Sequence, residues 1–184
     1  MFTLPAALRA RGFALRPETD ADLGFLTALY ASTREAELAP LPWSAEQKAA
    51  FLAQQFQAQR HHYRDTIDGC AFDVIEHEGE PVGRLYLEPR AAHLNLVDIA
   101  LLPAWRGQGV GAAMLEALQD AARAGGRGVI AFVEKTNPAL RLYHRLGFAA
   151  TVDHGVYLEI EWLPEGASRS DGAPSSGSDG SSGA

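Results

Sequence analysis

Three glycines at alternate positions, Gly107, Gly109 and Gly111, give this 184-residue sequence its clearest chemical signal. A glycine has no Cβ atom, so the backbone N–H groups around it can approach a bulky anion closely. A helix-like stretch follows, and the N-terminus of a helix carries partial positive charge. With the guanidinium of Arg106 beside them, the glycines predict a site for a phosphate or pyrophosphate group. The alternative is an ordinary glycine-rich turn before a helix.

Two other classes of nucleotide-binding loop contain similar glycines, and the sequence argues against both. A lysine P-loop needs Lys-Ser or Lys-Thr directly after the glycines, and neither is present. The dinucleotide fingerprint is formally matched by Gly107, Gly109 and Ala112, with Glu134 further on as a candidate ribose-binding carboxylate. A dinucleotide fold, however, requires successive parallel strand–helix units, whereas a hairpin meander is expected before this turn.

Asp98 is a second candidate for a chemical role, because it is a charged residue within the otherwise apolar stretch 96–100. A carboxylate surrounded by such neighbours needs a polar partner or a function. Burial raises the pKa of a carboxyl group in general, which suits a general base. Asp98 is therefore a candidate catalytic base, and a structural, hydrogen-bonded aspartate is an equal alternative. Glu134 is a weaker candidate for the same role.

The histidines and the cysteine predict no further site. The six histidines are scattered except for His61 and His62, which would point in different directions on a helix, so no metal ion is expected. The single Cys70 is expected to be a small buried residue and not a nucleophile. One cysteine allows no intrachain disulfide, which fits a reducing compartment.

The composition limits the class of protein. Hydrophobic residues make up 47% of the chain, enough for one globular domain with a sizeable core. A net charge of −7 argues against a nucleic-acid-binding protein, whose surface is usually basic. No apolar run is long enough for a membrane span, and residues 1–11 do not resemble a signal peptide. We therefore expect a soluble, cytoplasmic protein.

The last twenty residues differ from the rest of the chain. Residues 165–184 are mostly Gly, Ser, Asp and Ala and contain no large apolar side chain. Such a segment cannot bury enough surface to offset the entropy lost on ordering. The sequence therefore predicts a folded domain over 1–164 and a disordered Gly/Ser-rich tail over 165–184.

Hydrophobic periodicity predicts the elements that would position these groups. Ser44 and Gln47 form a capping box at the start of one helix, and Glu78-Gly79-Glu80 indicates a hairpin. Helices are expected to begin near residues 21 and 44 and to cover 112–124 and 138–146. Strands are expected at 13–16, 70–76, 81–88, 93–101, 128–133 and 156–162. This order predicts a mixed α/β sheet with helices on both faces.

Two motifs in this order resemble the GNAT superfamily of N-acetyltransferases. Residues 101–111 read Leu-x-Pro-x-x-Arg-Gly-x-Gly-x-Gly, which resembles the acyl-CoA signature of that family. Residues 133–148 resemble a later motif, in which Asn137 opens a helix, Tyr143 closes it and Leu-Gly-Phe follows. Two motifs in the right order are far more specific than either alone. The resemblance covers nearly the whole folded chain, from residue 13 to 162.

The resemblance implies a fold of the α/β (α+β) class, the GNAT acyl-CoA N-acyltransferase fold. This is a splayed mixed sheet of about six or seven strands flanked by about four helices. The acetyl and pantetheine arm of acetyl-CoA would lie in the gap between the strands at 93–101 and 128–133. Free backbone groups from Ile99 to Leu101 would hold the arm, so a β-bulge is expected there. The Leu101 N–H would donate to the acetyl carbonyl.

The resemblance also implies roles for other residues. Tyr143 matches the position of the acid that protonates the leaving thiolate, and its alternative is a core aromatic. Asn137 stands one residue closer to Tyr143 than in many members, so either Asn137 or Thr136 would contact the cofactor. Asn137 before a proline also fits a helix cap. The pyrophosphate would be held beside Arg106 and Gly107 by the backbone N–H groups of Gln108, Gly109, Val110, Gly111 and Ala112.

The function implied is N-acetyl transfer from acetyl-CoA to a primary amine of a small molecule or peptide, by direct attack in a ternary complex. A catalytically silent acyl-CoA-binding module is the alternative, against which the retention of Tyr143 counts. A homodimer is compatible with either. The family builds its acceptor pocket in the region corresponding to 41–60, where Trp43, Tyr63 and Tyr86 would either line the pocket or pack as core.

Overall fold

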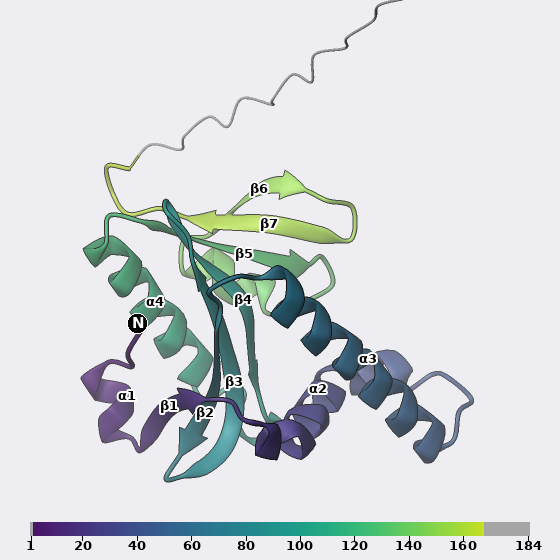
Figure 1. Ribbon diagram of the computed structural model, residues 1–184. Coiled ribbons are helices and arrows are strands. Elements are labelled where there is room, and N and C mark those ends of the chain that lie inside the picture. Colours follow the sequence, from purple (N-terminus) through teal and green to yellow (C-terminus); the bar gives the residue numbers. More distant parts are fainter. Residues whose placement is uncertain (1, 168–184) are drawn as a thin grey trace, which may run out of the picture.

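The computed structural model describes residues 2–167 and shows one seven-stranded mixed sheet with helices on both faces (Figure 1). The strand order is β1-β2-β3-β4-β5-β7-β6. The helices are α1 (Ala6–Ala10), α2 (Leu23–Leu38), α3 (Ala45–Thr66), α4 (Val110–Ala124) and α5 (Leu140–Arg145). Two short 3-10 turns, η1 (Asp20–Asp22) and η2 (Pro103–Trp105), precede α2 and α4. The strands are β1 (Phe13–Pro17), β2 (Ala71–His77), β3 (Glu80–Pro89), β4 (His93–Leu101), β5 (Gly128–Glu134), β6 (Ala149–Asp153) and β7 (Tyr157–Trp162).

The predicted fold class is confirmed, and the differences from prediction lie in short elements. No sequence pattern indicated α1, because its five residues follow Pro5 and include a charged side chain. None indicated β6 either, which is a short, largely exposed edge strand without an apolar alternation. The helix predicted over 138–146 is shorter and begins at Leu140. From residue 168 on, the predicted tail lies outside the described residues.

Two local predictions are confirmed by backbone geometry. Ser44 accepts a hydrogen bond from the Gln47 N–H, and the Gln47 side chain accepts one from the Ser44 N–H, so the capping box begins α3. Between β2 and β3, Glu78 and Gly79 have φ values of 51° and 86°. Two consecutive left-handed residues are typical of the tight hairpin turn that joins antiparallel strands.

The two sides of the sheet have different cores. On the side of α1, α4 and α5, one cluster joins buried residues of these helices to the strands, among them Leu8, Met114, Leu118 and Tyr143. On the other side, α2 and α3 enclose a separate small cluster of Leu26, Tyr30, Leu38, Leu52 and Phe56. Burying a large apolar side chain contributes about 1.5–3 kcal/mol. The first side therefore provides most of the apolar stabilisation.

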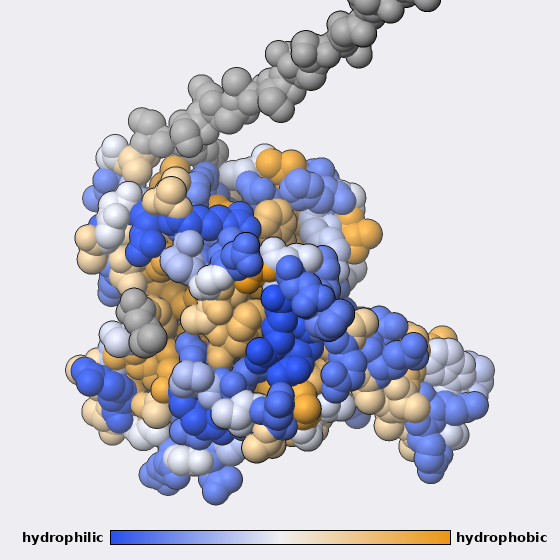
Figure 2. Space-filling view, in the orientation of Figure 1, coloured by the Kyte–Doolittle hydropathy of each residue, from blue (hydrophilic) through white to orange (hydrophobic). Residues whose placement is uncertain are grey.

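The α2–α3 hairpin projects from the body of the protein, and its surface mixes hydrophilic and apolar residues (Figure 2). Only Leu52 and Phe56 of the 22-residue α3 are buried. Across residues 2–167, none of the helices combines the length and the apolar character needed to cross a membrane.

The sheet opens between its two central strands. Parallel pairing of β4 with β5 joins only His93–Leu96 to Gly128–Ala131, after which the strands separate. The rest of β4 remains paired with β3 alone, and the rest of β5 with β7 alone. The splayed sheet predicted from the resemblance is thus present.

A β-bulge lies in β4, but not where we expected it. Leu96 and Asp98 pair with the consecutive residues Leu87 and Tyr86, so Val97 is the extra residue. The prediction of a bulge at 99–101 is therefore wrong by two positions. The extra residue reverses the alternation of side chains, which places Asp98 on the α2–α3 side although Leu96 faces α4.

Candidate functional site

The glycine turn leads into α4 without any side chain that covers the helix end. Gly107 and Gly109 have φ values of 70° and 79°, a region that favours glycine. Gly109 is the N-cap of α4 and provides no side-chain cap, so the first N–H groups of the helix lack a partner within it. A Cβ atom built on Gly107, Gly109 or Gly111 would meet no protein atom within 4 Å. The glycines therefore keep open a space beside exposed backbone donors, which fits an anionic group.

Arg106 lies beside this space, although its guanidinium is also used within the protein. Its Nε atom donates to the carbonyl oxygen of Leu101 at 2.8 Å, and Nη2 donates to Ser32 Oγ at 2.7 Å. The Gln108 side chain donates to the carbonyl oxygen of Ala104. Arg106 thus joins the end of β4 to α2 next to the turn, and it remains exposed enough to reach an anion as well.

The open side of β4 presents backbone donors to the gap. The N–H of Leu102 donates to the carbonyl oxygen of Val82 on β3 at 2.8 Å. Because successive residues of a strand point their backbone groups to opposite sides, Leu101 and Ile99 direct theirs away from β3, toward the gap. The bond from Arg106 to the Leu101 carbonyl is consistent with that direction. Leu101 and Ile99 are therefore placed where an acyl arm could pair with the backbone.

Tyr143, on α5, is buried at the α4 side of the sheet. Its side chain is 6% exposed, and its ring meets that of Phe148 edge-on at 5.3 Å. Burial, aided by the negative charge of Asp98, raises the pKa of the Tyr143 hydroxyl well above its usual value near 10. The phenol consequently keeps its proton at neutral pH and could donate it to a stronger base.

Asp98 lies on the opposite face of β4 and has a defined partner. Its Oδ2 atom accepts a hydrogen bond of 2.5 Å from Nη2 of Arg84, which is 3% exposed, while the Asp98 side chain is 18% exposed. Burial raises the pKa of Tyr63 on α3, and the charge of Asp98 raises it further. Asp98 therefore acts electrostatically on phenols from both sides of the sheet, Tyr143 and Tyr63.

Comparison with known proteins identifies a family domain within the chain. Residues 68–150 match the model of the acetyltransferase (GNAT) domain. This chain carries a GNAT domain. The match spans the β2–β3 hairpin, the glycine turn, the gap and Tyr143. Among curated proteins, none has a sequence that matches the chain.

Solved structures support the GNAT fold at low sequence identity. The paia N-acetyltransferase of Thermoplasma acidophilum, solved in complex with coenzyme A, is 17% identical with a TM-score of 0.61, over 83% of this chain and 99% of that one. An acetyltransferase of Thermus thermophilus is 21% identical with a TM-score of 0.58, over 82% and 96% of the two chains. These neighbours show the shared fold.

Asn137 in the second GNAT motif has a structural contact. Its Oδ1 atom accepts a hydrogen bond from the Ala139 N–H at 2.9 Å, just before α5 begins. This contact is an Asx turn that precedes the helix, so the prediction that Asn137 is the helix cap is wrong: the N-cap of α5 is Ala139. Both Asn137 and Thr136 are exposed, so both could contact a ligand.

A cleft of about 410 Å³ lies between α2, α3 and β7. Its polar lining includes Arg34, Glu37 and Gln59, and Tyr157 closes one side. Arg34 forms an ion pair with Glu134 at the end of β5, with an Nη2–Oε1 distance of 2.9 Å, and Tyr157 donates to the same carboxylate at 3.3 Å. These contacts join α2 and β7, which line the cleft, to the end of β5, where the sheet is open.

The aromatic residues proposed for the acceptor pocket lie in different places. Trp43 is 40% exposed and packs against Phe51 in a separate depression near the tip of the hairpin. Tyr86 is 2% exposed and its hydroxyl donates to Glu18 at 2.6 Å, so its role is in the core. Tyr63 of α3 lies close enough to Asp98 for the charge of Asp98 to raise its pKa.

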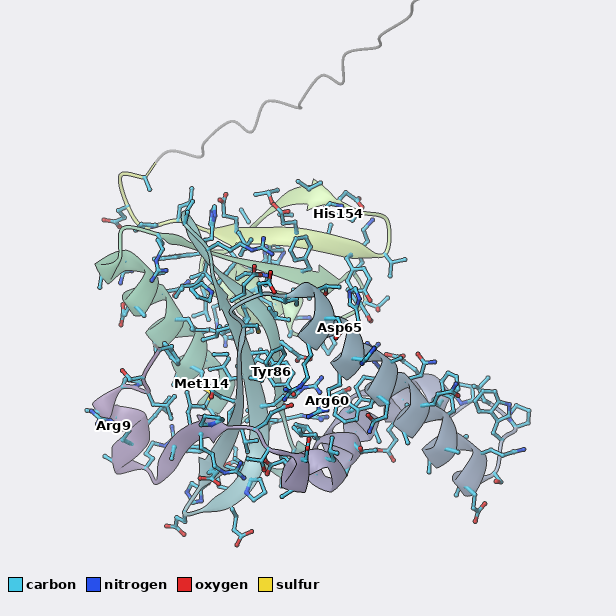
Figure 3. The ribbon with its side chains drawn as sticks, viewed as in Figure 1. Arg9, Arg60, Asp65, Tyr86, Met114 and His154 are labelled. Carbon is cyan, nitrogen blue, oxygen red and sulfur yellow. The ribbon has the colours of Figure 1, made fainter. Side chains whose placement is uncertain are left out.

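A buried ion-pair network holds α3 on this face. The Glu18 carboxylate, whose side chain is 1% exposed, accepts hydrogen bonds from Arg60 and Arg64 of α3 as well as from Tyr86. Figure 3 shows Arg60 and Tyr86 close together between the helix and the sheet. Sequence reasoning missed this network because its members are far apart in the chain.

The described part of the chain, residues 2–167, contains no group of three or more His, Cys, Asp or Glu side chains that could hold a metal ion.

Proposed function

We propose that this protein transfers an acetyl group from acetyl-CoA to a primary amine by direct attack in a ternary complex. The observation that carries the proposal is the juxtaposition of an uncapped, glycine-lined helix start with a strand gap that exposes the backbone groups of Ile99 and Leu101. The coenzyme A complex of the Thermoplasma acidophilum neighbour supports the assignment of the ligand.

The residues present fit acetyl-CoA in charge and shape. The N–H groups of residues 108–112 would hold the pyrophosphate, because no side chain caps the start of α4 and its first N–H groups have no partner within the helix. Arg106 would contribute positive charge beside them. The Leu101 N–H would polarise the acetyl carbonyl and stabilise the negative charge that develops on its oxygen.

The transfer requires two proton movements. The neutral amine attacks the acetyl carbon, the C–S bond breaks, and the sulfur takes the proton of the Tyr143 hydroxyl as the thiol leaves. Asp98, on the acceptor side, is the candidate to receive the proton that the amine loses. Tyr143 then recovers a proton from solvent and Asp98 releases its proton to solvent, so the enzyme returns to its starting state.

The cleft between α2, α3 and β7 is the proposed acceptor site. It ends at Gln59, whose side chain contacts Arg84, the partner of Asp98. An amine that enters the cleft would therefore reach the carboxylate from the face opposite to Tyr143. A cytoplasmic enzyme acting on a small molecule or a peptide fits this arrangement.

The test is thiol release from acetyl-CoA in the presence of a panel of primary amines, with calorimetry of coenzyme A binding. Transfer to one class of amine supports an enzyme. Tight coenzyme A binding with no release above the hydrolysis background for any amine would support the silent acyl-CoA-binding module instead. If Asp98 is the base, Asp98→Asn removes the acidic limb of the pH–rate profile.

A further inference from the structure

Arg84 is the most deeply buried cation in the neighbourhood of the proposed site. It lies on β3 with 3% exposure, and its guanidinium lies over the rings of Phe56 and Tyr86 at 5.8 and 5.1 Å. Nη2 donates to Asp98 and to Gln59, whereas Nε and Nη1 have no hydrogen-bond partner among the described residues. Burial of a charged guanidinium is unfavourable unless a carboxylate balances its charge, and for Arg84 that carboxylate is Asp98.

Asp98 depends on Arg84 in return. Its charge acts on three phenols, Tyr63, Tyr86 and Tyr143, whose pKa values are raised first by burial and then in part by Asp98. A phenol is neutral when protonated and negative when ionised, so none of the three can balance the charge of a carboxylate. The guanidinium of Arg84 is the charge that does so, at 2.5 Å.

We infer that Arg84 is a positioning residue of this site, which fixes the carboxylate of Asp98 beside the cleft while the acceptor amine binds. The inference rests on the proposed function, in which Asp98 is the base. The ion pair between Arg84 and Asp98 is itself observed. Without Arg84, the Asp98 carboxylate would lose the cationic partner that the structure gives it, and Arg84 in turn would be buried without a counter-ion if Asp98 were removed. The pair therefore holds the carboxylate in one orientation.

Gln59 connects the Arg84–Asp98 pair to the wall of the cleft. Its Oε1 atom accepts from Arg84 Nη2 at 3.0 Å, and its side chain belongs to the cleft lining. One guanidinium nitrogen thus connects α3 to Asp98 on β4. The position of the Asp98 carboxylate is therefore fixed relative to α3, the helix that would contact the acceptor.

The experiment compares Arg84→Gln with Arg84→Lys. Glutamine keeps a hydrogen-bond donor for Asp98 and removes the charge, whereas lysine keeps the charge and loses the planar fork. The readout is the split between kcat and coenzyme A affinity. Without the cation the Asp98 carboxylate can turn away from the amine, so kcat should fall by about 10–100-fold in Arg84→Gln. In Arg84→Lys most of that loss should be recovered.

Calorimetry of coenzyme A binding provides the second readout. The affinity should be unchanged in both variants, because Arg84 does not contact the glycine turn. Arg60→Gln is the matched control, because Arg60 binds Glu18 and not Asp98, and it should move neither readout.

Two results would overturn the inference: an unchanged kcat in Arg84→Gln, or equal losses of kcat in the glutamine and lysine variants. A loss of coenzyme A affinity as large as the loss of kcat would also count against a positioning role. Absence of acetyl transfer in the wild type would instead refute the proposed function, and crystal structures of the wild type and Arg84→Gln would still decide whether Arg84 fixes the orientation of Asp98.

Discussion

The two faces of the sheet are stabilised in different ways. The face covered by α1, α4 and α5 joins twenty-two buried residues, nearly all apolar, in one cluster. The face covered by α2 and α3 has five buried apolar residues and the buried polar side chains of Glu18, Asp22 and Arg84. One face relies on apolar burial, and the other on ion pairs with well-defined geometry.

This difference matches the groups that each face presents. Next to the apolar face lie the glycine turn and the open edge of β4, where the proposed ligand contacts are mostly backbone N–H groups. On the polar face, the cleft is lined by side chains, including Arg34, Glu37 and Gln59. Backbone donors suit an invariant cofactor, whereas side chains can be exchanged to suit an acceptor without changing the fold.

The largest expected effect tests the backbone site. Gly109→Asp should lower the affinity for coenzyme A by at least about 100-fold, because a carboxylate would face the pyrophosphate and the left-handed φ of 79° would be strained. Gly109→Asn has a similar shape and tolerates that φ, so it separates charge from strain. Calorimetry measures both. Equal affinity in Gly109→Asp and wild type would place the cofactor elsewhere.

The next effect tests whether the apolar face contributes chemistry beyond its backbone. Tyr143→Phe keeps the ring and its contact with Phe148 but removes the proton. General acid catalysis is typically worth about 10²–10⁴-fold, so kcat should fall by that factor while affinity for acetyl-CoA changes little. Single-turnover kinetics with a chemistry-limited amine provide the measurement. A nearly normal kcat would mean that Tyr143 only packs and that the thiolate takes its proton from water.

Much of the apolar face could be predicted from the sequence, because its signals are local. The bounds of β4 match the prediction residue for residue, and the glycine turn and start of α4 follow from residues adjacent in the chain. The bulge at Val97 could not be predicted, since an extra residue in one strand depends on the register of the other. That single residue decides the face on which Asp98 lies.

The polar face was far less predictable. Arg84 sits in an apolar strand where a lone charged residue would be expected to point to solvent, yet it is sealed under Phe56 of α3. Glu18 and its partners Arg60 and Arg64 are separated by more than forty positions. Ion pairs over such distances leave no periodic pattern in the sequence, so only the assembled fold reveals them.

A third prediction tests the claim that ion pairs hold the polar face. Glu18→Gln keeps the shape of the side chain but leaves Arg60 and Arg64 without their shared carboxylate. Because both arginines remain partly hydrated, the free energy of unfolding should fall by about 2–3 kcal/mol, measured by urea denaturation. Glu35→Gln, at an exposed position of α2, is the control and should be near neutral. Equal stability of the two variants would show that the network adds nothing.

A fourth prediction concerns acid stability on the same face. Arg16, with help from the Thr19 backbone and hydroxyl, holds the pKa of Asp22 well below its usual range. The stabilisation from a lowered pKa is fully present above the unfolded-state value near 4 and is lost as the pH falls further. Asp22→Asn should therefore be less stable than wild type at pH 6, with a gap that narrows below about pH 4. Asp120→Asn, at an exposed site on α4, should show no such pH-dependent gap.

The smallest expected effect tests whether the start of α3 contributes to the position of the cleft. Ser44→Ala removes the cap at the outer end of the helix, while Gln59 and the arginines lie toward its other end. Loss of a capping serine typically costs about 1 kcal/mol, so the denaturation midpoint should fall with an unchanged slope. Gln47→Ala removes the reciprocal hydrogen bond, and the double variant should cost less than the sum of the two because they share one motif. Turnover and acceptor KM should not change, since fraying of the first turn leaves the Arg84–Gln59 contact in place. A several-fold rise in acceptor KM in Ser44→Ala would show that α3 positions the cleft as one rigid unit, in which case the ion pairs of Glu18 alone do not fix this face.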